Sequence, residues 1–243
     1  MAAIAIYSPK GGVGKTTLAV NLAWAAATLS NRRTLLWDLD PQAASTLLIG
    51  PTTGSSDQAQ AIFTRDLPPA RLVRRTRIDR LDLIAADTSL RSLDRLFHEL
   101  DKKKRLAKLA GDLGKAYDRI LIDCPPGLSE TSEQVMRAAD LIVVPVNPSP
   151  LSTRAFDEAA AHLGRRGYKT PLMPVHSMVD RRRKLHAATL EAHPDWPVIP
   201  MASIVETMAV RRLPVGQFAA RSASARAFAT LWQAIERRLA ARR

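Results

Sequence analysis

Close behind its N-terminus the chain reads Ser8-Pro9-Lys10-Gly11-Gly12-Val13-Gly14-Lys15-Thr16-Thr17. The residues before this stretch, Ala2-Ala3-Ile4-Ala5-Ile6-Tyr7, form an apolar run with the length of a buried parallel strand. The residues after it, Leu18–Ala27, are rich in alanine and leucine and favour a helix. A strand, a glycine-rich loop and a helix in this order predict a loop that binds phosphate groups.

Each residue type in this loop suits phosphate binding. Gly11, Gly12 and Gly14 let the backbone curl so that several N–H groups point into one concavity, and the helix N-terminus adds partial positive charge. Lys15 can reach the terminal phosphates, and the hydroxyl of Thr16 can bind a Mg²⁺ ion. A glycine-rich turn that binds nothing is the alternative, and the strand–loop–helix context disfavours it.

The spacing within the loop departs from the ordinary pattern G-x-x-x-x-G-K-[ST], because Pro9 stands where that pattern has its first glycine. A second lysine, Lys10, lies five residues before Lys15. In this respect the loop resembles the deviant Walker A motif of the ParA/MinD family of ATPases. The resemblance implies that Lys10 reaches across a dimer interface to the nucleotide of the partner subunit. It also implies an ATP-binding set made of Lys10, Gly11, Gly12, Val13, Gly14, Lys15, Thr16 and Thr17.

A second signature, Asp38-Leu39-Asp40-Pro41-Gln42, follows the apolar run 33–38. Ligands of open α/β sheets bind at the carboxyl ends of strands, so both carboxylates are expected near the phosphates. One of them could instead cap the helix expected to begin near Ala43. The D-x-D-P-Q run resembles the second motif of the family, which implies that Asp40 orients the attacking water and that Asp38 supports the loop and the metal. Ala43 stands where family members usually have glycine.

A third signature is Tyr117-Asp118-Arg119-Ile120-Leu121-Ile122-Asp123-Cys124-Pro125-Pro126-Gly127. Its apolar strand delivers a carboxylate to the sheet edge, as a Walker B strand does, so Asp123 is expected to hold Mg²⁺ through a water molecule together with Thr16. Cys124 is interpreted as a packing residue, since a catalytic cysteine needs an activating base and no nearby histidine is evident. The resemblance implies that 125–127 is a switch that senses the γ-phosphate, with the backbone N–H of Gly127 as a donor.

Further apolar runs at 81–86, 140–146, 171–179 and 196–199 read as strands, and helical patterns are expected near 57–63 and over 89–113, 153–164 and 223–242. Residues 202–211 are expected to form a short helix or a loop. This alternation predicts an α/β fold: one domain over residues 1–243, with a doubly wound, mostly parallel sheet flanked by helices. The resemblance to the family extends from Ile4 to the last helix.

The composition indicates a protein with an anionic partner. The chain has 243 residues, a net charge of +13 and a hydrophobic content of 46%, and nine of the net positive charges fall in residues 151–243. Such asymmetry favours nucleic acid or a membrane surface, although arginine can also serve solubility alone. A single cysteine, Cys124, fits a reducing cytosol, and no apolar stretch approaches the roughly 20 residues of a membrane span. The first residues are expected to be a strand and not a signal peptide.

Within the basic half, the resemblance implies two groups of contacts. Met178 and Asp180 belong to a Met-x-Asp-Arg stretch that lies close to the adenine in family members. Six arginines resemble positions that hold DNA phosphates, a sequence-independent and salt-sensitive mode of binding. They are Arg181, Arg182, Arg183, Arg211, Arg212 and Arg221.

Together these patterns predict an ATPase that uses Mg²⁺, forms a homodimer around ATP and binds nonspecific DNA in that state. A ParB-like or other partner protein is expected to stimulate hydrolysis, and the expected location is the cytoplasm, at the nucleoid. The alternative is a MinD-like ATPase whose last helix, with its apolar stripe from Phe228 to Leu239, inserts into a membrane. A metal-cluster ATPase is disfavoured because no C-x-x-C is present, and the five histidines have no zinc-binding spacing.

Overall fold

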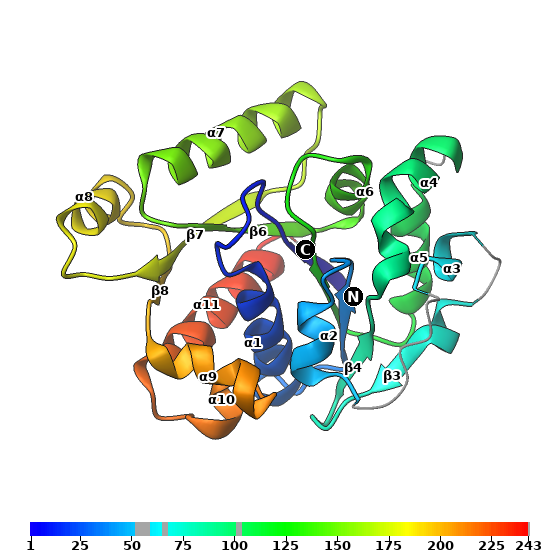
Figure 1. Cartoon of the computed structure of the whole chain (residues 1–243), viewed down its shortest axis with the longest axis horizontal. Coiled ribbons are helices and arrows are strands. Elements are labelled where there is room, and N and C mark those ends of the chain that lie inside the picture. Colours follow the sequence, from blue (N-terminus) through cyan, green and yellow to red (C-terminus); the bar gives the residue numbers. More distant parts are fainter. Residues whose placement is uncertain (52–58, 65–67, 101–103, 243) are drawn as a thin grey trace.

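The computed structural model describes residues 1–51, 59–64, 68–100 and 104–242. Eight of its strands form one sheet in the order β3-β4-β2-β5-β1-β6-β7-β8, and every neighbouring pair is parallel except β3 with β4 (Figure 1). The strands are β1 (Ala2–Ile6), β2 (Thr34–Asp38), β3 (Val73–Arg75), β4 (Leu81–Ile84), β5 (Arg119–Asp123), β6 (Leu141–Val146), β7 (Leu172–Val179) and β8 (Val198–Pro200).

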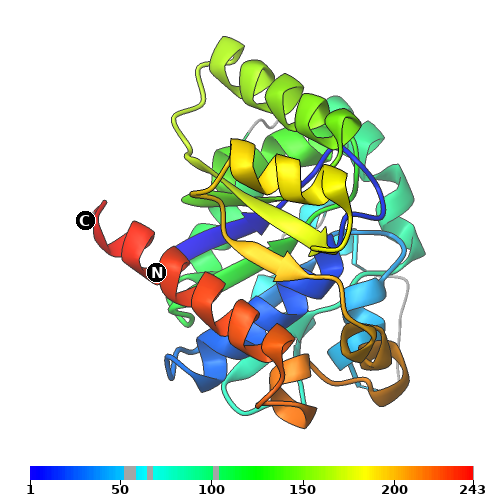
Figure 2. The same ribbon diagram turned by 90° about the vertical axis from the view of Figure 1, so that its left-hand side faces the viewer.

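Helices cover both faces of this sheet (Figures 1 and 2). One face packs against α1 (Lys15–Thr28), α2 (Ala44–Ile49), α9 (Ser203–Arg211), α10 (Val215–Phe218) and α11 (Ala223–Ala240). The other packs against α3 (Ala61–Thr64), α4 (Leu93–Leu100), α5 (Arg105–Leu113), α6 (Glu130–Ala138) and α7 (Pro150–Arg165). The remaining elements are α8 (Lys184–Ala192), beside the β7–β8 edge, and two 3₁₀ helices, η1 (Pro69–Leu72) and η2 (Thr88–Ser92). The predicted doubly wound, mostly parallel α/β sheet is therefore confirmed.

The seven predicted strands are all present, and the differences lie in short or polar elements. Strand β3 was not predicted, because Val73-Arg74-Arg75 lacks an apolar run and pairs only at the sheet edge. Helix α6 was also missed; it begins at a capping box in which Ser129 and Ser132 bond each other's backbone N–H groups. The helix expected at 57–63 is seen from Ala61, and its first two residues lie outside the described part of the chain.

Strand register explains why the signatures converge. The last residues of β2 and β5, Asp38 and Asp123, are register partners on adjacent parallel strands. Strand β1 pairs with the other side of β5, so the loop that follows Ile6 begins at the same edge of the sheet. Parallel strands thus bring three segments that are distant in sequence to one edge, where ligands of such sheets bind.

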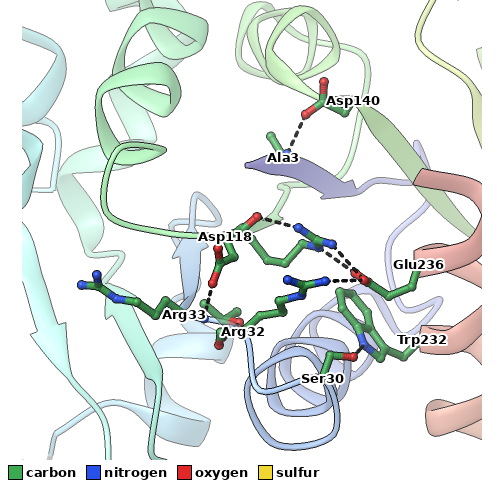
Figure 3. Close-up of polar contacts among 10 residues, drawn as sticks. Ala3, Ser30, Arg32, Arg33, Asp118, Asp140, Trp232 and Glu236 are labelled. Atoms are coloured by element: carbon green, nitrogen blue, oxygen red, sulfur yellow. Dashed lines mark hydrogen bonds and ion pairs between the residues drawn. The ribbon is translucent and has the colours of Figure 1, made fainter. Parts of the chain in front are cut away.

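The last helix is fixed to the opposite end of the sheet by polar contacts (Figure 3). The buried guanidinium of Arg119, the first residue of β5, donates two hydrogen bonds to Glu236 of α11, at 2.7 and 2.8 Å. The indole N–H of Trp232 donates to Ser30 Oγ at 2.7 Å. The apolar stripe of α11, from Phe228 to Leu239, is buried against the sheet and α1. Helix α11 is therefore part of the core in this structure.

Glu236→Gln should lower the free energy of unfolding by about 2 kcal/mol or more, because it leaves the buried charge of Arg119 without its anionic partner. The matched control is Glu158→Gln, which removes an Arg–Glu pair of similar length, 2.8 Å, between exposed side chains of α7. That change should cost less than about 0.5 kcal/mol. Urea unfolding of both variants is the measurement, and equal losses would contradict the account of how α11 is anchored.

Candidate nucleotide site

The loop between β1 and α1 has the backbone that a phosphate cradle requires. Gly12 and Gly14 have φ of +69° and +88°, in the left-handed region that favours glycine. Gly14 is the N-cap of α1, and neither a capping side chain nor an acidic residue occupies the first turn of that helix. The N–H groups at this terminus, with the partial positive charge of the helix, are therefore free to meet an anion.

Two contacts from elsewhere in the fold hold the loop in shape. Ser177 of β7 donates a hydrogen bond from its hydroxyl to the carbonyl of Val13 at 2.8 Å, and both residues are buried. The backbone N–H of Gly127, in the predicted switch, donates to the carbonyl of Pro9 at 3.2 Å. The role of Ser177 could not be predicted, because nothing in the sequence links a β7 residue to a loop 164 positions earlier.

The two lysines of the loop point in different directions. Lys15 is buried, with 7% of its surface exposed, and its ammonium donates to the carbonyl of Lys10 at 3.2 Å. Burial lowers the pKa of Lys15, while the charges of Asp123 and Asp40 oppose that effect. The ammonium of Lys10 instead reaches Ser152 Oγ, in the first turn of α7, at 3.3 Å. Lys15 thus turns back to the backbone of its own loop, whereas Lys10 turns toward α7.

The carboxylates of Asp38 and Asp123 are both completely buried at the sheet edge. Asp38 accepts hydrogen bonds from the backbone N–H and the hydroxyl of Thr46, at 2.9 and 2.8 Å, and from the N–H of Asp40 at 3.1 Å. Asp123 accepts from the Ser45 hydroxyl through Oδ2 at 2.7 Å. Its other oxygen, Oδ1, is buried without a hydrogen-bond partner among the described residues.

Burial raises the pKa of both carboxyl groups. For Asp38 the charge of Asp123 acts in the same direction, and the hydrogen bonds from Thr46 and Asp40 oppose it only in part. For Asp123 the hydroxyls of Ser45 and Thr16 oppose the effect of burial. Two such carboxylates on adjacent strands form a site that favours a cation.

Asp40 lies half-buried at the mouth of this site. Its carboxylate accepts from the backbone N–H of Gln42 at 2.9 Å, and its carbonyl accepts from the N–H of Ala43. Ala43 has φ of +54°, so the position where family members usually have glycine is a left-handed one that alanine occupies under strain. Helix α2 begins there as predicted. Ala43 is the N-cap residue, so neither Asp38 nor Asp40 is the N-cap, although Asp38 accepts from the backbone N–H of Thr46 in the first turn of α2.

Of the two predicted adenine contacts, Met178 lines a cavity beside the loop and Asp180 does not. Met178 has φ of +58° and lines a small cavity of about 80 Å³ beside Gly14 and Thr17 of the loop. Asp180 is not among the residues that line this cavity. Its carboxylate accepts two hydrogen bonds from the guanidinium of Arg182 and one from the backbone N–H of Arg182, and these bonds lower the pKa of Asp180 to about 2.

The six predicted DNA contacts have different surroundings. Arg181, Arg183 and Arg221 are exposed and have no ion pair among the described residues, whereas Arg182 is paired with Asp180. Arg211 lies over the ring of Phe218. Arg212 donates from Nε to the carbonyl of Leu47 at 2.8 Å and from Nη2 to that of Gly50 at 3.3 Å.

Other parts of the described chain offer less to a nucleotide. A larger cavity, of about 640 Å³, lies between η1, β3 and α5 at the opposite ends of the strands and includes none of the predicted site residues.

The thiol of Cys124 is buried, and burial raises its pKa well above the ordinary value, which suits the predicted packing role. The described residues contain no group of three or more acidic, cysteine or histidine side chains that could hold a metal by themselves. No helix that the structure describes has the length and apolar character needed to cross a membrane.

Comparison with known proteins decides the family. Residues 1–163, which are more than half of the chain, match the AAA domain family. The chain is also 30% identical over 191 residues to the chromosome partitioning protein ParA of Caulobacter vibrioides, an alignment that covers 75% of this chain and 71% of that protein. The chain belongs to the ParA/MinD family of deviant Walker A ATPases.

Other members of the ParA/MinD family are similar over different lengths. The sporulation initiation inhibitor protein Soj of Bacillus subtilis is 34% identical over 145 residues, which are 59% of this chain and 57% of Soj. The alignment thus spans little more than half of that relative. Among solved structures, the septum site-determining protein MinD of Pyrococcus horikoshii, complexed with Mg-ADP, superposes with a TM-score of 0.80 at 21% identity, covering 96% of this chain and 95% of MinD. That likeness confirms the fold.

The two buried carboxyls predict how the stability of the nucleotide-free chain changes with pH. Their pKa values are raised on folding, so the folded state binds protons that the unfolded state has released above about pH 4. Their contribution therefore makes the chain less stable as pH rises from about 4 through the raised pKa. Asp38→Asn should reduce this loss. Urea unfolding at several pH values, with Asp79→Asn on an exposed loop as control, measures the slopes. Identical slopes for Asp38→Asn and the unmodified chain would contradict the assigned pKa shifts.

Proposed function

We propose that the chain, acting as one domain, hydrolyses Mg-ATP, forms a homodimer around two ATP molecules and binds nonspecific DNA in that state. The observation that carries the proposal is the division between the two lysines of one loop. Lys15 is buried beside the helix N-terminus, and Lys10 extends to Ser152 without any acidic partner among the described residues. One lysine suits the phosphates of its own site, and the other is placed to reach the phosphates of a second subunit.

The residues at the sheet edge suit a magnesium ion. Thr16 lies in the first turn of α1, close enough for its hydroxyl to affect the pKa of Asp123. Oδ1 of Asp123, which has no hydrogen-bond partner within the described part of the chain, would accept from a metal-bound water. Thr16 and Asp123 would hold Mg²⁺, with Asp38 supporting the site. The ion would neutralise charge on the phosphates during transfer.

Asp40 is the candidate for orienting the attacking water. It is half-buried at the site mouth and contributes to the electrostatic environment of Lys15. Such a carboxylate places water in line with the γ-phosphoryl group and needs no raised basicity. Gly127 would sense that group through its backbone N–H, which lies at the loop and donates to the carbonyl of Pro9 in the structure.

A second subunit would cover the face around Lys10. Leu151, next to the Ser152 contact, is 71% exposed, and Leu128, next to the switch, is 48% exposed. Large apolar side chains left in water beside a binding loop favour a protein interface there.

Exposed arginines support DNA as the anionic partner. Arg181 and Arg183 project from the turn before α8, and Arg221 lies just before α11, all without ion pairs among the described residues. Relatives named for chromosome partitioning favour a role in positioning DNA or another large cargo, with a ParB-like or other partner that stimulates hydrolysis. The protein would then act in the cytoplasm, at the nucleoid. The membrane alternative is disfavoured because the apolar stripe of α11 is buried in the core.

The test is binding to a nonspecific DNA duplex with ATP, with ADP and without nucleotide, over a range of salt concentrations. We expect tight binding only with ATP, and an affinity that falls with salt at a slope of about 0.9 per phosphate contacted. Lys15→Ala, which removes the phosphate-binding ammonium and leaves the arginines in place, should not bind DNA under any of these conditions.

Two results would contradict the proposal. Equal DNA binding with ATP, with ADP and without nucleotide would mean that DNA binding by the arginines does not depend on the nucleotide site. ATP-dependent binding to anionic vesicles, without binding to DNA, would favour the membrane alternative.

A further inference from the structure

Helix α2 lies directly against both buried carboxylates of the candidate metal site. The Ser45 hydroxyl bonds Asp123, and the N–H and hydroxyl of Thr46 both bond Asp38. Thr46 Oγ1 also accepts from the N–H of Ala86, just beyond β4, at 2.9 Å. The first turn of α2 is thus the main source of hydrogen bonds that orient the two acids, so a shift of this helix would move both of them.

At the other end of α2, where Leu48 and Ile49 are buried in the core, one side chain meets two backbone carbonyls. The helix has six residues, and the carbonyls of its last turn have no partners within the helix. Arg212 supplies donors for two carbonyls there, because its Nε donates to the carbonyl of Leu47 and its Nη2 to that of the C-cap residue Gly50. The planar guanidinium spans both acceptors, a geometry that a lysine ammonium cannot reproduce.

The backbone holds Arg212 in place for this task. The residue is the C-cap of α9, with φ of +53° in the left-handed region, and its N–H donates to the carbonyl of Met208 at 2.7 Å. Met208 in turn contacts the fully buried Asn21 of α1, whose amide donates to the Met208 sulfur and whose carbonyl accepts from the N–H of Val215. The segment that carries Arg212 is therefore fixed to the helix that follows the phosphate loop.

We propose that Arg212 is a positioning residue for the metal-side carboxylates, which it orients through α2, and that it is not a DNA contact. The proposal rests on the proposed function for the identity of that site as a magnesium site. It separates Arg212 from its neighbour Arg211, which is exposed over Phe218 and free to meet a phosphate.

The test compares Arg212→Ala, Arg212→Lys and Arg211→Ala. The first readout is the gain in ADP affinity that Mg²⁺ provides, measured by calorimetry with and without the ion. Loss of a residue that orients metal ligands should reduce this gain about tenfold or more. Both Arg212 variants should lose this gain in affinity, because lysine keeps the positive charge but cannot donate to both carbonyls as the guanidinium does. Arg211→Ala should keep the full gain.

The second readout needs neither metal nor nucleotide. Amide hydrogen exchange over residues 44–50 of the nucleotide-free chain should accelerate in both Arg212 variants and not in Arg211→Ala. The third readout is DNA affinity at saturating Mg-ATP. Arg211→Ala should reduce the salt slope by about 0.9, and Arg212→Lys should leave that slope unchanged.

The proposal would be overturned if Arg212→Lys behaved as the unmodified chain in the first two measurements, or if Arg212→Ala changed only the salt slope. Absence of DNA binding by the unmodified chain would refute the proposed function and leave the first two readouts able to decide the role of Arg212. Should Arg212→Ala fail to fold while Arg212→Lys folds with normal exchange over α2, the proposal would be wrong.

Discussion

Two carboxylates that should repel each other meet, fully buried, at the ends of adjacent strands. Burying an acid is costly unless it is hydrogen-bonded, neutralised or given a cation, and Asp38 and Asp123 receive only part of what they need from the protein. Asp38 accepts three hydrogen bonds, whereas one oxygen of Asp123 has no partner among the described residues. Much of the surrounding structure follows from this constraint: the first turn of α2, the buried ammonium of Lys15 and the hydroxyl of Thr16.

The sequence predicted the fold well because the fold depends on local patterns. Apolar runs that end in glycine or aspartate predict buried parallel strands with polar residues at one edge of the sheet, so Asp38 and Asp123 could be expected to meet there, as they do. The supporting residues could not be predicted. Ser45, Thr46 and Ser177 are ordinary hydroxyl residues whose importance depends on which strand or helix packs beside them, and nothing in the local sequence marks them.

In the basic half of the chain, too, local sequence does not tell which residue each side chain contacts. Arg211 and Arg212 carry the same charge and cannot be distinguished by it. The side chain of Arg211 lies over the ring of Phe218, whereas that of Arg212 is hydrogen-bonded to the end of α2. Edge strand β3 was missed for a related reason, since arginines at a sheet edge need no apolar periodicity. Positive charge thus serves at least two purposes in this protein, and only the contacts of each side chain distinguish them.

We propose that Lys10 acts in the site of a second subunit, while Asp40 acts in the site of its own chain. The most direct measurement mixes Lys10→Ala and Asp40→Ala chains, each of which retains Lys15 and should still bind ATP, and follows phosphate release. In a mixed dimer the Lys10→Ala chain keeps its own Asp40 and receives Lys10 from the Asp40→Ala chain, so one site is complete. We expect the mixture to hydrolyse ATP faster than either variant alone. A rate equal to the average of the two separate rates would contradict the account.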